Sequence, residues 1–159
     1  MIFMWIGKVK EAIKYIENNL FESITVESVG KAINYAPSSF SNIFSAVTGY
    51  SIGEYIRFRR LSCAANEIVD NRCSVTEMAF ECGYETVEAF SKAFKRMFGC
   101  APSKISRSEA RYHRFNPISI DFKLIGGYEM KRNLIPNMLK VDWSDPVRQN
   151  EFVNSVVSV

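Results

Sequence analysis

The chain has 159 residues, enough for one ordinary domain or for one small domain with an appendage, whereas two full domains would be cramped. Its 47% apolar and 23% charged residues, with 8 Gly and 5 Pro, exclude a disordered chain and predict a packed core. The net charge of +3 and the pI near 8.7 permit a nucleic-acid partner without requiring one. Any case for DNA binding therefore depends on where the charges lie.

Cysteine spacing and the N-terminus exclude several further classes. Cys63, Cys73, Cys82 and Cys100 form no CxxC pair, so a zinc site or a thioredoxin-like dithiol lacks its spacing, and we expect reduced thiols. The N-terminal apolar run is too short for a signal peptide, and no stretch approaches the length of a membrane span. The sequence therefore predicts a cytoplasmic protein with no membrane partner and no cofactor.

Three helices are expected in the first third of the chain. Apolar residues at helical spacing predict an amphipathic helix over residues 8–20, with Glu and Lys on its outer face. Thr25 can cap a second helix over residues 26–33. A third helix is expected over residues 37–48, because proline suits its first turn and Gly49 can adopt the left-handed conformation that ends it.

The next three helices follow two capping-box patterns, in which a serine precedes a glutamate by three residues. The first pattern, Ser51–Glu54, opens a long helix that extends to about residue 69. The second, Ser74–Glu77, is followed by expected helices over residues 75–82 and 86–98. All of this part of the chain is predicted to be α-helical.

The tail has a different pattern. Apolar and polar residues alternate over residues 118–124 up to a Gly-Gly pair, which is typical of a strand that enters a turn. A lone strand needs partners, and the residues that follow offer too little to build a sheet. We therefore expect a helical domain at residues 1–108, and a linker with the start of a second, absent domain at residues 109–159. The lone strand is expected to be disordered or held by another surface, and deletion after Ser108 should leave the helical domain folded.

The helical part contains an internal repeat. At an offset of 49 residues, Val26, Val29 and Tyr35 match Val75, Met78 and Tyr84; at an offset of 50, Phe40, Phe44 and Gly49 match Phe90, Phe94 and Gly99. The change of offset places one extra residue in the second turn. Each half is a short helix, a tight turn and a second helix with apolar residues where the two must interlock, which is a helix-turn-helix unit. The alternative from this pattern alone is a six-helix bundle with accidental similarity.

The connecting helix sets the distance between the two units. About 19 residues at roughly 1.5 Å each make it about 28 Å long, so the second helices of the units could lie about one duplex turn, roughly 34 Å, apart. They could then enter successive major-groove segments. Six of the thirteen Lys and Arg residues before position 109 form two groups on the predicted DNA side: Arg57, Arg59 and Arg60, and Lys92, Lys95 and Arg96. The alternative is that these charges form only a solvated face.

Two stretches carry a family likeness: "TGYSIGEYIRFRRLSCAANEIV" and "SVTEMAFECGYETVEAFSKAFKRMFGCAPSKI". They resemble the tandem helix-turn-helix domain of the AraC/XylS transcription regulators over about residues 8–107. The resemblance implies an all-α fold of two homeodomain-like subdomains joined by a long helix. It also implies a sequence-specific regulator, expected to be an activator, that inserts two recognition helices into adjacent major grooves and contacts RNA polymerase. The length of the connecting helix predicts an operator of roughly 20 base pairs.

The resemblance also assigns DNA-binding residues. Carried over by position, the base-facing residues are Ser38, Ser41 and Asn42 in the first recognition helix, and Val87, Glu88, Ser91 and Lys92 in the second. Asn42 suits adenine and Lys92 suits the acceptors of guanine, while Val87 suits a thymine methyl and Glu88 could accept from cytosine. The clustering of charge, rather than the resemblance, adds Arg57, Lys95 and Arg96 to the predicted set, with Arg57 on the connector expected against phosphate oxygens. Any one of these side chains could instead face only water or phosphate.

The tail and the remaining residues bear on other functions. "FNPISIDFKLIGGYEM" resembles the start of the gyrase-inhibitor-like effector domain that follows this domain in one branch of the family, but the chain stops soon after, so no small-molecule effector is expected. His113 has no evident partner and no phosphate-cradling glycine pattern occurs, so we expect no enzyme. The alternative function is a protein-interaction module or antagonist that keeps the fold without DNA affinity, since Glu85 and Glu88 would repel phosphate.

Overall fold

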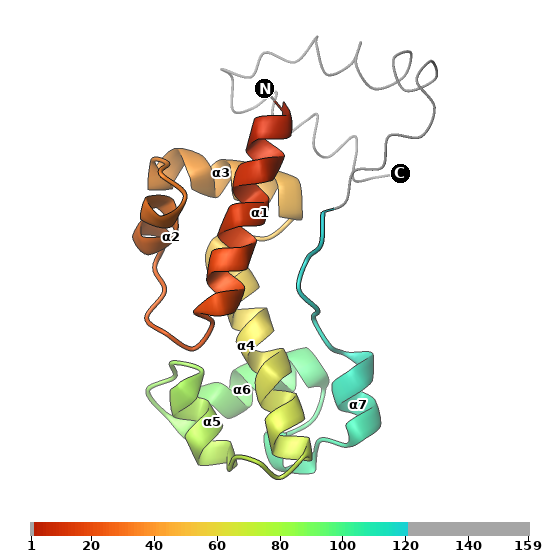
Figure 1. Ribbon diagram of the computed structural model, residues 1–159. Coiled ribbons are helices and arrows are strands. Elements are labelled where there is room, and N and C mark those ends of the chain that lie inside the picture. Colours follow the sequence, from red (N-terminus) through yellow and green to blue (C-terminus); the bar gives the residue numbers. More distant parts are fainter. Residues whose placement is uncertain (1, 121–159) are drawn as a thin grey trace, which may run out of the picture.

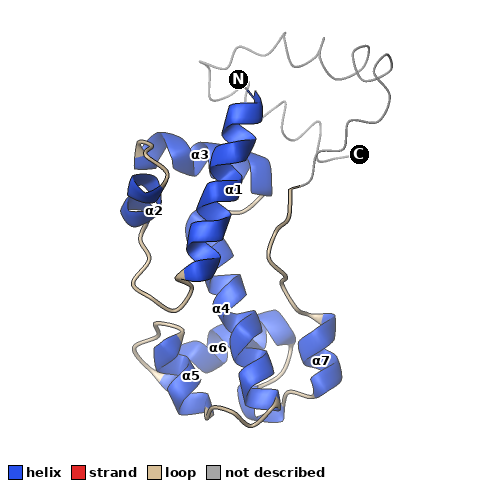
Figure 2. Cartoon of the chain, in the orientation of Figure 1, coloured by secondary structure: helices blue, strands red, loops and turns tan. Residues whose placement is uncertain are grey.

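The computed structural model describes residues 2–120 (Figure 1). In this range the regular elements are α1 Ile2–Asn18, α2 Val26–Ala32, α3 Pro37–Thr48, α4 Ile52–Val69, α5 Val75–Glu81, α6 Val87–Phe98, the short 3-10 helix η1 Pro102–Lys104 and α7 Arg107–Tyr112. Figure 2 shows only helices and loops in the described part, which confirms the all-α fold there. Most of the strand expected at residues 118–124 lies outside the described residues. No helix between residues 2 and 120 has the length and apolar character needed to cross a membrane.

Most helix ends follow the local sequence as predicted, but α1 begins at Ile2 and ends at Asn18, whereas residues 8–20 were expected. Thr25 caps α2 by accepting a hydrogen bond from the backbone N–H of Ser28 at 3.1 Å. Both predicted capping boxes, Ser51–Glu54 and Ser74–Glu77, are formed, and the hydrogen bond from each serine backbone lowers the pKa of the glutamate carboxyl. Gly49 and Gly99 end α3 and α6 in the left-handed conformation, with φ of 77° and 78°.

Two apolar cores divide the helices into two units. The first unit consists of α1, α2, α3 and the first half of α4, and its core buries Phe40 and Phe44 completely. The second unit consists of the second half of α4, with α5 and α6, and its core buries Phe90 and Phe94 completely. The phenylalanines that repeat in the sequence thus occupy equivalent buried places, which confirms two helix-turn-helix units that share one long helix.

The turns of the two units differ by one residue. The turn between α2 and α3 spans residues 33–36, and the turn between α5 and α6 spans residues 82–86. Asn34 has a positive φ of 54° in the first turn, and Gly83 has a φ of 82° in the second. A side chain at Gly83 would be strained, because L residues rarely adopt this conformation. The extra residue predicted from the change of offset therefore lies in the second turn.

The second helices of the two units lie on the same side of the molecule. In Figure 1, α3 passes behind α1 and α6 passes behind α4, while α2 and α5 lie to the left of the shared axis. We call α3 and α6, the second helices of the two units, the reading helices, after the role that the sequence predicts for them. This arrangement leaves the far side of the molecule, as drawn, to the reading helices of both units.

A segment after α6 returns along α4 from the second unit to the first. Ala110 of α7 is buried in the second core, whereas Ile118 and Ile120 pack against the first core. Phe115 lies between them and packs edge-on against Tyr50 and Tyr55, with ring centroids 5.0 and 5.7 Å apart. Residues 113–120 are called the strap below. The packed part therefore continues past residue 108, and we now expect deletion after that position to destabilise the helices.

Candidate nucleic-acid interface

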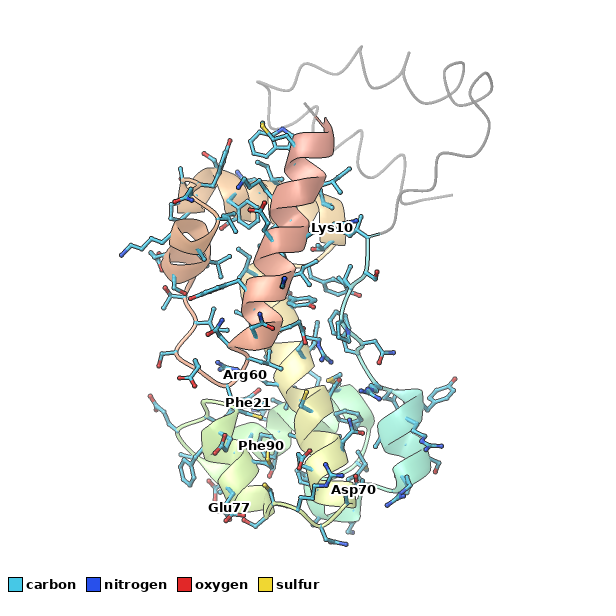
Figure 3. The ribbon with its side chains drawn as sticks, in the orientation of Figure 1. Lys10, Phe21, Arg60, Asp70, Glu77 and Phe90 are labelled. Carbon is cyan, nitrogen blue, oxygen red and sulfur yellow. The ribbon has the colours of Figure 1, made fainter. Side chains whose placement is uncertain are left out.

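α6 exposes four predicted DNA-binding side chains on the face opposite its core. Thr86 caps the helix by accepting from the backbone N–H of Ala89 at 3.1 Å, and Phe90, labelled in Figure 3, lies on the buried face. The exposed side chains of the set are Glu88, Lys92, Lys95 and Arg96. Because the aromatic face fixes the rotation of α6, these charges point away from the protein.

Val87 and Ser91 occupy the border of that face. Both are half-buried, and Val87 packs against the second core. Only part of the valine side chain therefore remains free for contact with a thymine methyl. The two residues are one helical turn apart, so they mark the edge of the surface that α6 can present to a partner.

Lys92, Lys95 and Arg96 form a cationic ridge along the second half of α6. Their spacing of three and four residues makes them neighbours on the helix surface, and no ion pair among residues 2–120 engages them. Like charges at this spacing destabilise an isolated helix by about 0.2–0.5 kcal/mol per pair. A polyanion against this ridge would offset that repulsion.

α3 presents a neutral surface. Ser38 and Asn42 are exposed and lie one turn apart, so they share a face. Ser41 is half-buried, and its hydroxyl donates to the carbonyl of Pro37 at 2.9 Å, which leaves only its oxygen lone pairs for another partner. The helix contains no charged residue from Pro37 to Thr48. The two reading helices therefore differ strongly in charge.

The comparisons with known proteins agree with this geometry. A family model described as a helix-turn-helix domain matches residues 29–108. The TetD protein of transposon Tn10 from Escherichia coli is 31% identical over 101 residues, which cover 64% of this chain and 73% of TetD. The chain belongs to the AraC/XylS family. It is therefore a DNA-binding transcription regulator, as the sequence resemblance predicted, and the interaction module without DNA affinity is not favoured.

Two further relatives extend the comparison. The transcriptional activator AarP of Providencia stuartii is 28% identical over 105 residues, which cover 66% of this chain and 78% of AarP. The solved DNA-binding domain of AdpA, a global transcriptional factor, superposes with a TM-score of 0.55 at 23% identity, covering 65% of this chain and 91% of that one. The likeness to AdpA shows that the fold is shared.

The prediction of the DNA-facing surface is wrong for two of its arginines. Of the three connector arginines, only Arg57 is exposed, with its guanidinium carbon 5.3 Å from the ring centre of Phe58. Arg59 is 5% exposed and forms a bidentate pair with Glu17, with nitrogen–oxygen distances of 2.8 and 2.9 Å. Arg60 donates to three backbone carbonyls of the protein. The connector of this AraC/XylS member therefore leaves one of its three arginines exposed.

The buried network around Arg59 was not expected from the sequence. Tyr55 donates its hydroxyl hydrogen to the Glu17 carboxylate at 2.8 Å, and Arg59 donates to the carbonyl of Phe115 at 2.7 Å. Burial, and next the bond to Glu17, raise the pKa of the Tyr55 hydroxyl. The sequence contains one indication of this network. Arg59 lies four residues after Tyr55 and three before Ser62, and this helical spacing places a charged residue on the buried stripe of α4.

Proposed function

We propose that this chain activates transcription by inserting α3 and α6 into successive major-groove segments of an operator of roughly 20 base pairs. The observation that supports this most directly is the pair of similarly built helix-turn-helix units whose reading helices lie on one side of the molecule (Figure 1). The 18 residues of α4 give a connector of about 27 Å at roughly 1.5 Å per residue. This length suits a groove repeat of roughly 34 Å once the widths of the units are added.

The proposed roles of the side chains follow from their exposure and chemistry. Asn42 and Lys92 are exposed at positions where each could form a directional bond to one base edge, adenine for the amide and guanine for the ammonium. Lys95, Arg96 and Arg57 would bind phosphate and set the register of the protein on the duplex. Because α3 is neutral, most of the sequence-independent attraction would come from the second unit and the connector.

The relatives support the same proposal at a coarser level. AarP is described as a transcriptional activator, and the DNA-binding domain of AdpA was solved in complex with a target DNA. Activation requires contact with the transcription machinery, so we propose RNA polymerase as the protein partner. The proposal places the chain in the cytoplasm, where a bacterial promoter and its polymerase are found.

Selection of bound duplexes from a random pool tests the proposal, followed by titration of the enriched sequence. We expect an operator with two contact blocks centred about 10 base pairs apart. An insertion of about half a helical turn between the blocks should remove most of the specific affinity, because it turns one block to the other face of the duplex. The same insertion outside the blocks is the control. Unchanged affinity after the central insertion would show that only one unit engages DNA.

A further inference from the structure

Arg60 joins the two units through their backbones. Its guanidinium donates from Nε to the carbonyl of Leu20 at 2.6 Å and from Nη2 to the carbonyl of Glu22 at 2.7 Å, both in the loop between α1 and α2. Its Nη1 donates to the carbonyl of Cys82 at 3.1 Å, at the start of the turn in the second unit. Figure 3 shows Arg60 where α1 ends, between the two units. One side chain therefore links the first unit to the helix-turn-helix of the second.

The contact is closely fitted on the side of the second unit. A Cβ atom placed on Gly83 would lie 3.0 Å from Nη1 of Arg60, so a larger residue would press on the guanidinium as well as strain the backbone. The thiol of Cys82 in turn lies 3.6 Å from the carbonyl of Arg60 and donates to it. Burial raises the pKa of this thiol to about 12, which keeps it protonated as a donor. The turn thus bonds to Arg60 through both backbone and side chain.

The strap forms a second link on another face of α4. The backbone N–H of Phe115 donates to the hydroxyl of Ser62 at 2.9 Å, and its carbonyl accepts from Arg59 at 2.7 Å. At about 100° per residue, Ser62 lies nearly opposite Arg60 around the helix. Since α7 is anchored in the second core and Phe115 packs on the first, the strap spans the same joint as Arg60 from the other side.

We infer that Arg60 is a positioning residue which, together with the strap, holds the two units in one relative orientation. The two units pack on different halves of α4, so these links add to the connection that the backbone of this helix makes near residue 60. A fixed orientation holds α3 and α6 at one angle around the duplex. Once the first unit is bound, the second unit is therefore already placed for its own groove and loses little further freedom on binding. This inference rests on the proposed function for its consequence on DNA, but not for the orientation itself.

The orientation is tested without DNA by residual dipolar couplings of the full chain. In the wild type, the amide couplings of both units should fit a single alignment tensor. In Arg60→Met, which keeps the apolar stem and removes the guanidinium, the tensors fitted to the two units should diverge while circular dichroism shows retained helix. Arg72→Met is the matched control, because among residues 2–120 this exposed arginine pairs only with Glu67 and Asp70, both within the second unit. A single tensor in folded Arg60→Met would overturn the inference.

If Arg60→Met loses its helix content, Arg60→Lys replaces it, since lysine keeps the charge but lacks the fork that reaches three carbonyls. On the selected operator, the folded variant should bind about tenfold more weakly than the Arg72→Met control and should lose its preference for one spacing between the blocks. An unchanged spacing preference would also contradict the inference. Absence of specific binding by the wild type would refute the proposed function, while the dipolar couplings would still decide the role of Arg60.

Discussion

Replacing Glu17 by glutamine should destabilise the helical part far more than its position near the end of α1 indicates. The carboxylate accepts two hydrogen bonds from Arg59 and one from Tyr55, and water can hardly replace these partners because only 6% of the Arg59 side chain is exposed. Loss of one partner from a fully buried ion pair costs about 3–5 kcal/mol, since the other charge stays buried. The Glu17 side chain is 22% exposed, so we discount this to about 2–3 kcal/mol.

Urea titration followed by circular dichroism measures this difference in the free energy of unfolding. Glu11→Gln is the matched control, because Glu11 lies in the same helix and forms a 2.8 Å pair with Lys8 while 56% of its side chain is exposed. That variant should change stability by no more than about 0.5 kcal/mol. Glu17→Gln should lower the urea concentration at the midpoint of unfolding without changing the slope of the free energy of unfolding against urea concentration. Equal effects of the two variants would refute the reasoning that burial makes the Arg59 pair important.

The remaining predictions concern the strap, pH and DNA. Phe115→Ala should lower the free energy of unfolding by about 1–2 kcal/mol, because a half-buried ring with aromatic neighbours is lost, and an unchanged urea midpoint would contradict this. The pKa of Glu77 is lowered from 4.5 in the folded state, so the ionised carboxylate stabilises the fold above about pH 4.5. This stabilisation is lost as the pH falls through the lowered pKa. Wild type should therefore lose more stability than Glu77→Gln in urea titrations at acid pH. Lys92→Ala should cost about 1–3 kcal/mol of binding free energy on the preferred operator and should relax the base preference at one position. Arg57→Ala should instead weaken binding to all sequences alike and reduce the slope of log affinity against log salt concentration by about one. Uniform weakening by Lys92→Ala would reassign that lysine to phosphate.

Features that depend on neighbouring residues could be predicted from the sequence. The capping boxes, the glycine stops and the repeated phenylalanines are local patterns, and the structure contains all of them. The same rule would have found α7, since Ser106 and Glu109 form one more capping box. The exposure of Asn42 and Lys92 also follows from helical spacing, whereas their contacts with bases stay predictions.

Features that depend on distant residues could not be predicted in this way. Arg59 and Arg60 read as surface charges, because the groups that bind them lie about forty residues earlier or more than twenty later in the chain. Hydrogen bonds to backbone carbonyls, such as those that Arg60 forms, leave no trace in side-chain composition. Only the position of Arg59 on the apolar stripe of α4 signalled burial, and no local pattern identified Glu17 as its partner.

Because the two reading helices differ in charge, we expect them to act at different stages of binding to DNA. If the proposed function holds, the cationic ridge of α6 should attract the duplex from a distance, so salt should act mainly on the association rate. The neutral surface of α3 should contribute only after contact, through short-range bonds that slow dissociation. Base substitutions in the α3 block should therefore shorten the lifetime of the complex while leaving its rate of formation almost unchanged.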